Sequence, residues 1–364
     1  MAEALSLTGL ALPALRGRQG SRVMYLVLPD NHVLNTFFTT EMEPLEDRSQ
    51  RQLDPKHARE IGDYIVRNPE DYALGAITYA VDTPGHFEEV IPGSGVGVLR
   101  LPLNARLRSV DGQHRRHGIK QAIDELESIG GHHTALLIYV EEDLARRRQM
   151  FSDMNNTARK VSKAINVAFD SRDPFARVAK RLAERHPLLI GHVESQAARV
   201  RAGSPHYYTL GAVHDAAKRL FVGPNGRVKD ASKFNDDAIY HSANGLFDLL
   251  SASRREFSLA KDATILDDLR RTTLLFSSTT LRVIAGTVYI VLGPGAGADA
   301  MTELAQAFSR IDFSPNAKIW VDSGFVSPGK ATPNARTQEL LSATDALVAE
   351  LKLHSQTPSE GGTE

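Results

Sequence analysis

The segment Ser109–Gly118 combines residue types that suit the binding of a phosphate group. We expect a short strand to lead into Asp111-Gly112 and a helix to begin at about Gln113. Glycine tolerates a positive φ at such a turn, and the unpaired N–H groups of a first helical turn attract anions. The guanidinium of Arg115 adds fork-shaped donors that match phosphate oxygens. These features predict a nucleotide or phosphate site formed by Asp111, Gly112, Gln113, His114 and Arg115.

Each side chain of this segment has more than one chemical interpretation. Asp111 could hold Mg²⁺ or orient an arginine, and Gln113 and His114 could contact a phosphate or a water molecule. Arg116 could add a second guanidinium. An Asp-Gly pair before a helix is also common in purely structural turns, where Asp111 and Arg115 would pair with each other and brace the helix. Both interpretations stay open at this point, and no catalytic residue is assigned.

A basic stretch follows farther along the chain. Residues Leu144 to Gly203 include thirteen Lys and Arg and five Asp and Glu, a local charge of +8, so the rest must carry −9 to give the net −1. Such a segment indicates a phosphate-bearing partner, although a solvated helical face has the same composition. Because asparagine hydrogen-bonds to phosphates and Lys and Arg supply charge, the predicted DNA contacts here are Arg147, Asn155, Asn156, Arg159, Lys160 and Lys163.

Two alternatives apply to this basic stretch. Three arginines at successive helical positions, Arg146 to Arg148, spread over about 200° of the helix surface, so they cannot all face one partner. Asn156 or Thr157 could instead be the N-cap of the apolar helix that follows. An N-cap and a phosphate contact are compatible with each other.

Smaller basic groups lie near the N-terminus. Arg16, Arg18 and Arg22 form one group, and Arg48, Gln50 and Arg51 form another. Taken alone, groups of this size are ordinary features of a protein surface.

The composition excludes several classes of protein. Hydrophobic residues make up 42% and charged residues 24%, which is typical of a globular protein. With zero cysteines, the chain has no disulfide, no thiolate nucleophile and no Fe–S cluster. No signal peptide or membrane span is recognised, so we expect a cytoplasmic protein without a membrane partner. No metal site is expected, because His132-His133 follows two glycines in a loop without carboxylate partners.

Apolar periodicity and breaker residues divide the chain into an α/β part and a mainly helical part. Strands are expected over residues 23–28, 74–81, 98–103, 106–110 and 134–140, with helices over 53–68 and 113–129 between them. After residue 141 we expect helices over 141–154, 161–169, 174–185, 210–221, 234–253, 264–290, 301–310 and 337–353. The predicted fold class is α+β, with domains over 10–160 and 161–353 packed on each other and a disordered tail over 354–364.

Several motifs, in order along the chain, resemble one known group of proteins. The segment VDGQHRRHGI is similar to the signature of the DGQHR-domain family, which includes the DndB family of DNA sulfur-modification proteins. Residues 12–20 resemble its N-terminal PAxRGxQ motif, residues 48–51 its R-x-Q-R element, and residues 151–163 and 169–173 its central block. The resemblance spans about residues 10–175. More remotely, the N-terminal part resembles the ParB/sulfiredoxin-like fold, in which a strand-to-helix turn with an arginine binds nucleotide phosphates.

This resemblance implies a DNA-binding regulator of a DNA phosphorothioate-modification system. It implies repression of the modification genes through their promoter DNA, an influence on which sites are modified, and contact with the sulfur-modification enzymes. It also implies that Arg48 and Arg51 line the same cleft as the Asp111–Arg115 turn. With this resemblance, the predicted DNA contacts near the N-terminus are Arg16, Arg18, Arg48, Gln50 and Arg51. Residues 210–221 are the candidate recognition helix. The oligomeric state is left open, including a homo-oligomer.

Two other functions are compatible with the sequence. One is a nucleoside-triphosphate hydrolase that binds ATP or CTP with Mg²⁺ at the Asp111–Arg115 turn, as the ParB resemblance suggests. A sulfiredoxin-like thiol reaction is excluded, because the turn has no cysteine. The other is a non-catalytic partner of the modification enzymes, which an exposed apolar stripe on the helix expected over 264–290 would support.

Overall fold

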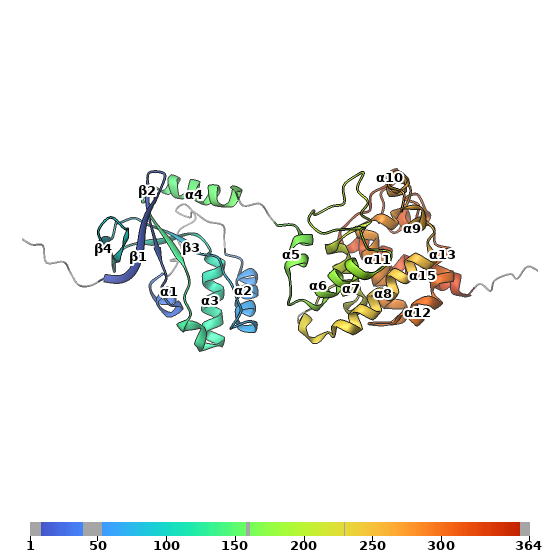
Figure 1. The fold of residues 1–364 in the computed structure, drawn as a ribbon, viewed down its shortest axis with the longest axis horizontal. Helices are drawn as coiled ribbons and strands as arrows, with labels where there is room; N and C mark the ends of the chain where they lie inside the picture. The colour runs from blue at the N-terminus through green and yellow to red at the C-terminus, as the bar shows by residue number, and fades with distance from the viewer. Residues whose placement is uncertain (1–8, 39–52, 158–160, 229, 357–364) are drawn as a thin grey trace, which may run out of the picture. The chain divides into compact units, whose positions relative to one another are not determined.

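The computed structural model describes residues 9–38, 53–157, 161–228 and 230–356. The chain divides between Arg159 and Lys160 into two compact units, each of which is described by itself (Figure 1). Over the described residues the structure has fifteen α-helices and a seven-stranded mixed sheet, which confirms the predicted α+β class.

The N-terminal unit is built on the seven-stranded sheet, whose strand order is β4-β5-β1-β2-β7-β3-β6. Strands β3 and β7 run parallel, and the other pairs are antiparallel. The strands are β1 (Gly9–Gln19), β2 (Arg22–Val27), β3 (Ile77–Val81), β4 (His86–Ile91), β5 (Val96–Pro102), β6 (Leu107–Asp111) and β7 (Leu136–Val140). β6 is therefore an edge strand, and it delivers the predicted phosphate-binding turn.

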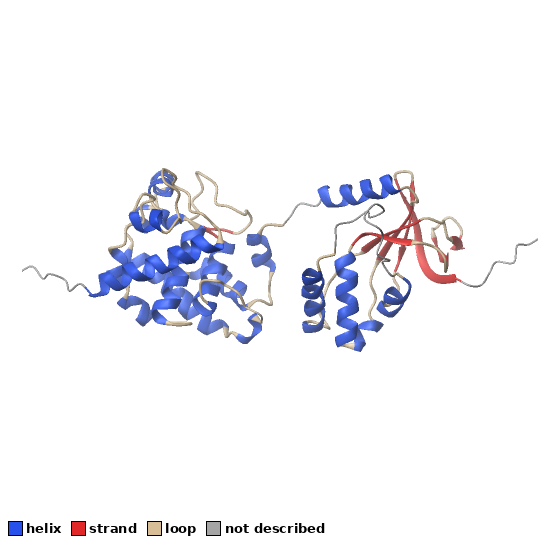
Figure 2. Ribbon diagram, turned by 180° about the vertical axis from the view of Figure 1, so that it is seen from behind, coloured by secondary structure: helices blue, strands red, loops and turns tan. Residues whose placement is uncertain are grey.

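Helices cover both faces of this sheet (Figure 2). Because successive residues of a strand point to opposite faces, Ile77 and Tyr79 join the core beneath three helices, whereas Ala80 packs with Met150 of the helix on the other face. The three helices are α1 (Asn31–Phe37), α2 (Pro55–Arg67) and α3 (Gln113–Glu125), with the 3₁₀ helix η1 (Glu127–Gly131) after α3, and the single helix is α4 (Leu144–Thr157). The sheet is thus the middle layer of the unit.

Three elements of this unit were not expected from the sequence. β1 contains Pro13, which disfavours a strand, but Pro13 lies just before the stretch of β1 that pairs with β2. β4 is an edge strand with little buried surface, so it lacks an apolar signal. α1 has only seven residues, and the Asp30 side chain caps it.

The C-terminal unit is a helical assembly around one large apolar core, with α7 packed against α11. Its longer helices are α5 (Lys163–Phe169), α6 (Pro174–Arg185), α7 (Leu210–Val222), α8 (Asp236–Ser253), α10 (Ala263–Thr272), α11 (Ser278–Leu292) and α15 (Thr337–Gln356). The short elements are α9 (Glu256–Leu259), α12 (Ala298–Glu303), α13 (Ala305–Ser309), α14 (Lys318–Asp322), the 3₁₀ helices η2 (Ala231–Lys233) and η3 (Leu274–Phe276), and a strand pair β8 (Val193–Glu194) and β9 (Tyr208–Thr209).

The structure corrects several helical boundaries. The helix expected over 264–290 is α10, η3 and α11, and it breaks before Ser277, which caps α11, while Gly286 lies buried inside α11. The segment 301–310 contains the end of α12 and all of α13. α15 continues to Gln356, three residues into the segment predicted as a disordered tail, and residues 357–364 lie outside the described ranges.

The helix predicted as a recognition helix has a structural role instead. Nine residues of α7 are buried, from Leu210 through Ala217 and again at Leu220. A helix covered on most of its surface by its own unit cannot enter a DNA groove. The prediction for residues 210–221 is therefore wrong.

The described ranges contain no helix whose length and apolar character would suit a bilayer crossing.

Replacement of Gly118 by alanine should destabilise the N-terminal unit. A methyl group at position 118 of α3 would lie 2.7 Å from Ile61 Cβ and 2.9 Å from the Ala58 carbonyl oxygen of α2. Such overpacking typically costs about 1–3 kcal/mol, which exceeds the gain of about 1 kcal/mol in helix propensity. The melting temperature of Gly118→Ala measures the net loss. Gly131→Ala, where the added methyl group meets nothing within 4 Å, is the control and should change the unfolding free energy by less than about 0.5 kcal/mol.

The C-terminal unit should lose stability in acid partly through His186. This side chain is 1% exposed; its Nδ1 accepts from the Leu188 N–H at 3.1 Å, and its Nε2 lies 3.2 Å from Asp248 Oδ1. Burial lowers the pKa of His186, against the opposing effect of Asp248. The unfolded chain therefore binds a proton at a higher pH than the native chain, and the contribution of His186 to stability is lost as pH falls below about 6.5.

Urea unfolding at pH 7.5 and pH 5.5 tests this expectation. The stability difference between wild type and His186→Gln should be larger at pH 7.5 than at pH 5.5. His241→Gln, an exposed position on α8, should show the same difference at both values. A His186→Gln deficit that does not change with pH would contradict the assignment.

Candidate nucleotide and nucleic-acid site

The turn between β6 and α3 has the geometry that the sequence predicts. β6 ends at Asp111, Gly112 adopts φ +95° and ψ 15°, and α3 begins at Gln113. A Cβ atom at Gly112 would lie 3.1 Å from Ile77 Cγ2 and would be strained at this positive φ. The N-cap of α3 is Gly112, which has no side chain to accept from the first N–H groups of the helix. The start of this helix therefore keeps the donor geometry that suits an anion.

The guanidinium of Arg115 is engaged within the chain. It forms an ion pair with Asp111, and its Nη1 donates to the Ala76 carbonyl oxygen at 2.8 Å. A Cβ atom at Gly75 would lie 2.8 Å from the same Nη1, so the guanidinium passes close to the backbone that precedes β3. The side chain of Arg115 is 23% exposed. In this structure Arg115 and Asp111 therefore brace the turn, as the structural interpretation of the motif predicts.

His114 links α3 to the beginning of α2. Its Nε2 accepts a hydrogen bond from the Asp54 N–H at 2.9 Å, and its ring lies 5.1 Å from the ring of His57. Burial, followed by the positive charge of a protonated His57, lowers the pKa of His114. His114 is therefore a neutral acceptor at pH 7, and it supplies no cation for a phosphate.

The second arginine of the motif is buried. Arg116 is 6% exposed, beside the buried Tyr79. A side chain in this position does not reach an external phosphate. The suggestion that Arg116 adds a second phosphate donor is therefore not supported, and the residue belongs to the packing between α3 and the sheet.

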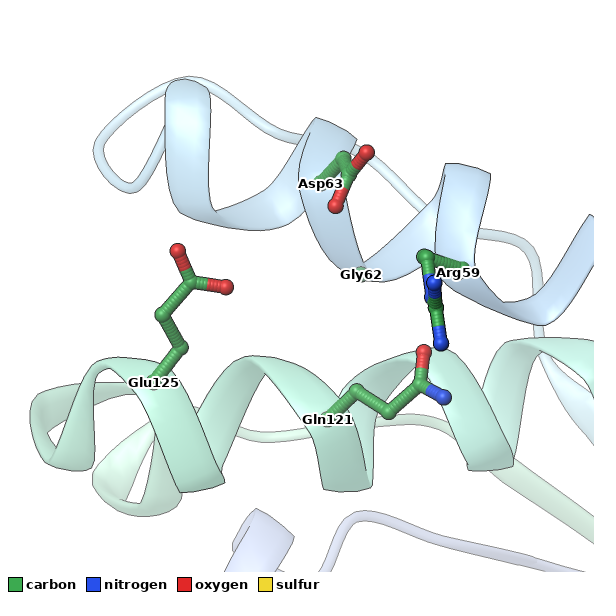
Figure 3. A pocket seen from close by; sticks show the side chains of 5 residues that line it. All are labelled: Arg59, Gly62, Asp63, Gln121 and Glu125. Atoms are coloured by element: carbon green, nitrogen blue, oxygen red, sulfur yellow. The ribbon is translucent and has the colours of Figure 1, made fainter. Parts of the chain in front are cut away.

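A surface pocket lies between α2 and α3 (Figure 3). Its volume is about 230 Å³, and Arg59 and Asp63 from α2 face Gln121 and Glu125 from α3 across it, with Gly62 in its wall. None of the predicted phosphate-binding residues lines it. Because its lining has two carboxylates and one guanidinium, it does not suit a polyphosphate.

The described ranges contain no group of three or more His, Cys, Asp or Glu side chains that could hold a metal ion. Of the two roles considered for Asp111, orienting an arginine is the one that this structure contains.

Arg16, Arg18 and Arg22 lie far from the turn within the same sheet. Arg16 and Arg18 are on β1, and three strands separate β1 from β6, a distance of about 19 Å at the usual strand spacing. The Arg16 guanidinium lies over the Phe87 ring at 4.7 Å, and Arg22 donates to the buried Glu141 at 3.3 Å. These residues therefore do not form one site with the turn.

The predicted DNA contacts on helix α4 differ in their exposure to solvent. Arg147 is 4% exposed and donates from Nη1 to the Glu142 carbonyl oxygen at 2.8 Å, so the prediction of a DNA contact for Arg147 is not supported. Asn155 and Asn156 are exposed near the end of α4. Neither Asn156 nor Thr157 caps the following helix, because Ser162 is the N-cap of α5.

Lys163 belongs to the C-terminal unit and forms an ion pair with Asp215. The remaining predicted DNA contacts, Arg48, Gln50, Arg51, Arg159 and Lys160, lie outside the described residues, and so does the proposed cleft of Arg48 and Arg51.

Three residues that contact the motif were missed by sequence reasoning. The Arg115 guanidinium passes close to Gly75 and donates to the Ala76 carbonyl oxygen, and the His57 ring lies beside that of His114. The only local signal was Gly75, because a glycine in an apolar strand often marks a place where another group approaches the backbone closely.

A search of the curated proteins returned no match, and a search of the solved structures returned none either. The family model for DndB, described as DNA-sulfur modification-associated, matches residues 12–354. The match includes the β6–α3 turn, α4 and the helices of the C-terminal unit, which extends the resemblance well past residue 175. Since nearly the whole chain is matched, it belongs to the DndB family of DNA-sulfur modification-associated proteins.

Proposed function

We propose that this chain is a DNA-binding regulator of a DNA phosphorothioate-modification system and represses the modification genes by binding their promoter DNA. Membership of the DndB family implies involvement in such a system. The local charge of +8 between Leu144 and Gly203 supports a partner rich in phosphate.

The exposed side of α4 is the observation that carries this proposal. Met150 faces the sheet, whereas Arg148, Gln149, Asn155 and Asn156 are exposed. The three amide groups each donate one hydrogen bond within the helix, to Asp153, to the Phe151 carbonyl oxygen and to Ser152 Oγ, so these exposed bonds would be exchanged for phosphate contacts. Amide and guanidinium groups are the donors that proteins use most often on DNA phosphates. In the sequence, Arg159 and Lys160 follow one residue after the end of this helix, so donors and charge are close together along the chain.

The second candidate function is hydrolysis of a nucleoside triphosphate at the β6–α3 turn, with ATP or CTP and Mg²⁺. The strand-to-helix turn with a glycine at the N-cap of α3 favours it. However, a nucleotide would have to replace the ion pair between Asp111 and Arg115, so DNA binding is the leading proposal. The ParB/sulfiredoxin-like assignment of the N-terminal unit belongs to this second candidate.

Binding to duplex DNA from upstream of the modification genes should weaken steeply with salt. We expect the affinity to fall with a log–log slope of several units, because phosphate contacts release counterions. The double variant Arg159→Ala/Lys160→Ala should bind more weakly and reduce the slope by up to about 2, at about 0.9 for each lost contact. Fluorescence anisotropy between about 50 and 200 mM salt measures both quantities.

Lys163 stays unchanged in this variant, because its removal would take one partner from the buried Asp215. The control is Arg310→Ala/Lys330→Ala, which removes two exposed cations from the C-terminal unit and should leave the slope unchanged. Equal affinity and slope for wild type and Arg159→Ala/Lys160→Ala would remove these residues from the interface.

Arg115→Ala should lower the melting temperature of the full chain. It removes the ion pair with Asp111 and the bond to the Ala76 carbonyl oxygen, a loss of about 1–3 kcal/mol for charge-assisted hydrogen bonds. If the turn also binds a nucleotide, calorimetry with ATP and CTP, with and without Mg²⁺, should show binding to wild type that Arg115→Ala weakens about 10- to 100-fold. Lys120→Ala, an exposed position on the same helix, is the control for both measurements.

The two outcomes separate the candidates. A lower melting temperature without nucleotide binding by wild type under any condition would leave Arg115 as a brace and eliminate the hydrolase. A normal melting temperature for Arg115→Ala would instead contradict the bracing role.

A further inference from the structure

A second cluster of charged side chains lies inside the C-terminal unit, where α5, α6 and α11 pack against α7 (Figure 1). It lies outside the β6–α3 turn, and Lys163 is its one member that the sequence analysis named individually as a contact. Helix α7 carries four of its members at positions that share one side of the helix or flank it. The full set is Lys163, Asp173, His214, Asp215, Lys218, Arg219 and Arg282.

The two carboxylates of this cluster already have partners. Asp215 pairs with Lys163 and, at 3.0 Å, with Nη2 of Arg282. Asp173, the N-cap of α6, lies 2.8 Å from Nε2 of His214. Despite burial, these partners hold the pKa of Asp215 far below its ordinary value. Both carboxylates are therefore ionised and engaged at neutral pH.

Lys218 and Arg219 are the two cations of the cluster that take part in none of these ion pairs. Among the described residues, no carboxylate oxygen lies within 4.0 Å of the charged nitrogen atoms of either side chain, and both are only partly exposed. Burial lowers the pKa of Lys218, against the opposing effect of the Asp173 and Asp215 carboxylates nearby. Burial also lowers the pKa of Arg219, against the opposing effect of Asp215. The Arg219 side chain donates from Nε to the Pro224 carbonyl oxygen at 3.1 Å.

The cluster is therefore electrically unbalanced. Its four Lys and Arg side chains face two carboxylates, a formal charge of +2 before any charge on His214 is counted. Despite burial, the hydrogen bonds to Asp173 and Asp215 raise the pKa of His214, so this residue can only add to the positive charge. A purely structural ionic network would gain stability from balanced charges, because an unpaired charge away from water is costly. An excess of half-buried cations is instead the arrangement that a bound anion would complete.

We propose that Lys218, Arg219 and Arg282 bind a phosphate group here, while Asp215 and Asp173 position the surrounding side chains. Two guanidinium groups and an ammonium match the oxygens of a phosphate in charge and in donor geometry. Arg282 is 28% exposed and Lys163 is 52% exposed, so the cluster reaches the surface of the unit. The group could come from the DNA backbone or from a small phosphate compound, and the site does not depend on the promoter-binding proposal.

The test compares phosphate with chloride at matched ionic strength and pH 7.5, using the melting temperature of the full chain. Phosphate raises the melting temperature of many proteins without binding, because it is excluded from their surface. The decisive result is therefore the difference in phosphate response between wild type and the variants. Wild type should show a rise that saturates with phosphate concentration. In Lys218→Met the apparent affinity for phosphate should be at least tenfold weaker, while the melting temperature in chloride should not fall. Lys261→Met, an exposed lysine of the same unit, should behave like wild type.

Two results would overturn the proposal. One is an equal phosphate response in wild type and Lys218→Met. The other is a Lys218→Met protein that melts several degrees lower in chloride and keeps the phosphate response, because this would assign Lys218 a structural role. If Lys218→Met fails to fold, Arg219→Gln carries the same comparison.

A second measurement identifies the source of the phosphate. A short DNA duplex that binds Lys218→Met at least threefold more weakly than wild type would identify a backbone phosphate. Unchanged duplex affinity, together with a lost phosphate response, would identify a small phosphate compound. Both results support the site, and neither depends on the promoter sequence or on Arg159 and Lys160.

Discussion

The guanidinium of Arg115 is the constraint on which the N-terminal unit depends. It joins three places that are distant in the sequence or different in structure: the end of β6 at Asp111, the backbone before β3 at Ala76, and the first turn of α3. Gly75 and Gly112 leave room for it, because a side chain at either position would approach its nitrogen atoms. Once α3 starts here, His114 meets the start of α2 through the Asp54 N–H. The same helix then brings Gly118 against α2 one turn later.

This arrangement changes how the DGQHR-like segment is understood. Its polar residues look like a ligand site in the sequence, yet the structure uses Asp111, His114 and Arg115 to connect elements to each other. Gly112, the N-cap of α3, brings no side chain to the first N–H groups of the helix. A ligand at this turn would therefore contact mainly the backbone, and it would have to compete with the Asp111–Arg115 pair for charge.

Local signals predicted the parts of the structure that local forces determine. The Asp111-Gly112 turn and α6, with Asp173 as its cap and Pro174 in its first turn, follow from the conformational preferences of a few adjacent residues. Long-range pairing was not predictable in this way. β4 forms a strand because it pairs with β5, which the sequence of β4 alone does not indicate. Likewise, the packing of α4 on the sheet determines which of its three successive arginines is buried. The partner of Lys163 is 52 residues away along the chain.

The same reasoning applies to the charge of the basic stretch. The local +8 counts each cation along the sequence, but the fold brings carboxylates from outside the stretch to several of them. Arg146 lies 3.0 Å from Glu141, and Arg177 lies 2.6 Å from Asp236. A cation that is paired in the native state contributes little to the attraction of DNA, because the field of its carboxylate opposes its own. The attraction of this chain for phosphate therefore depends on the cations that the fold leaves without a direct carboxylate partner. Outside the basic stretch, Lys218 and Arg219 of α7 are two such cations within the described residues.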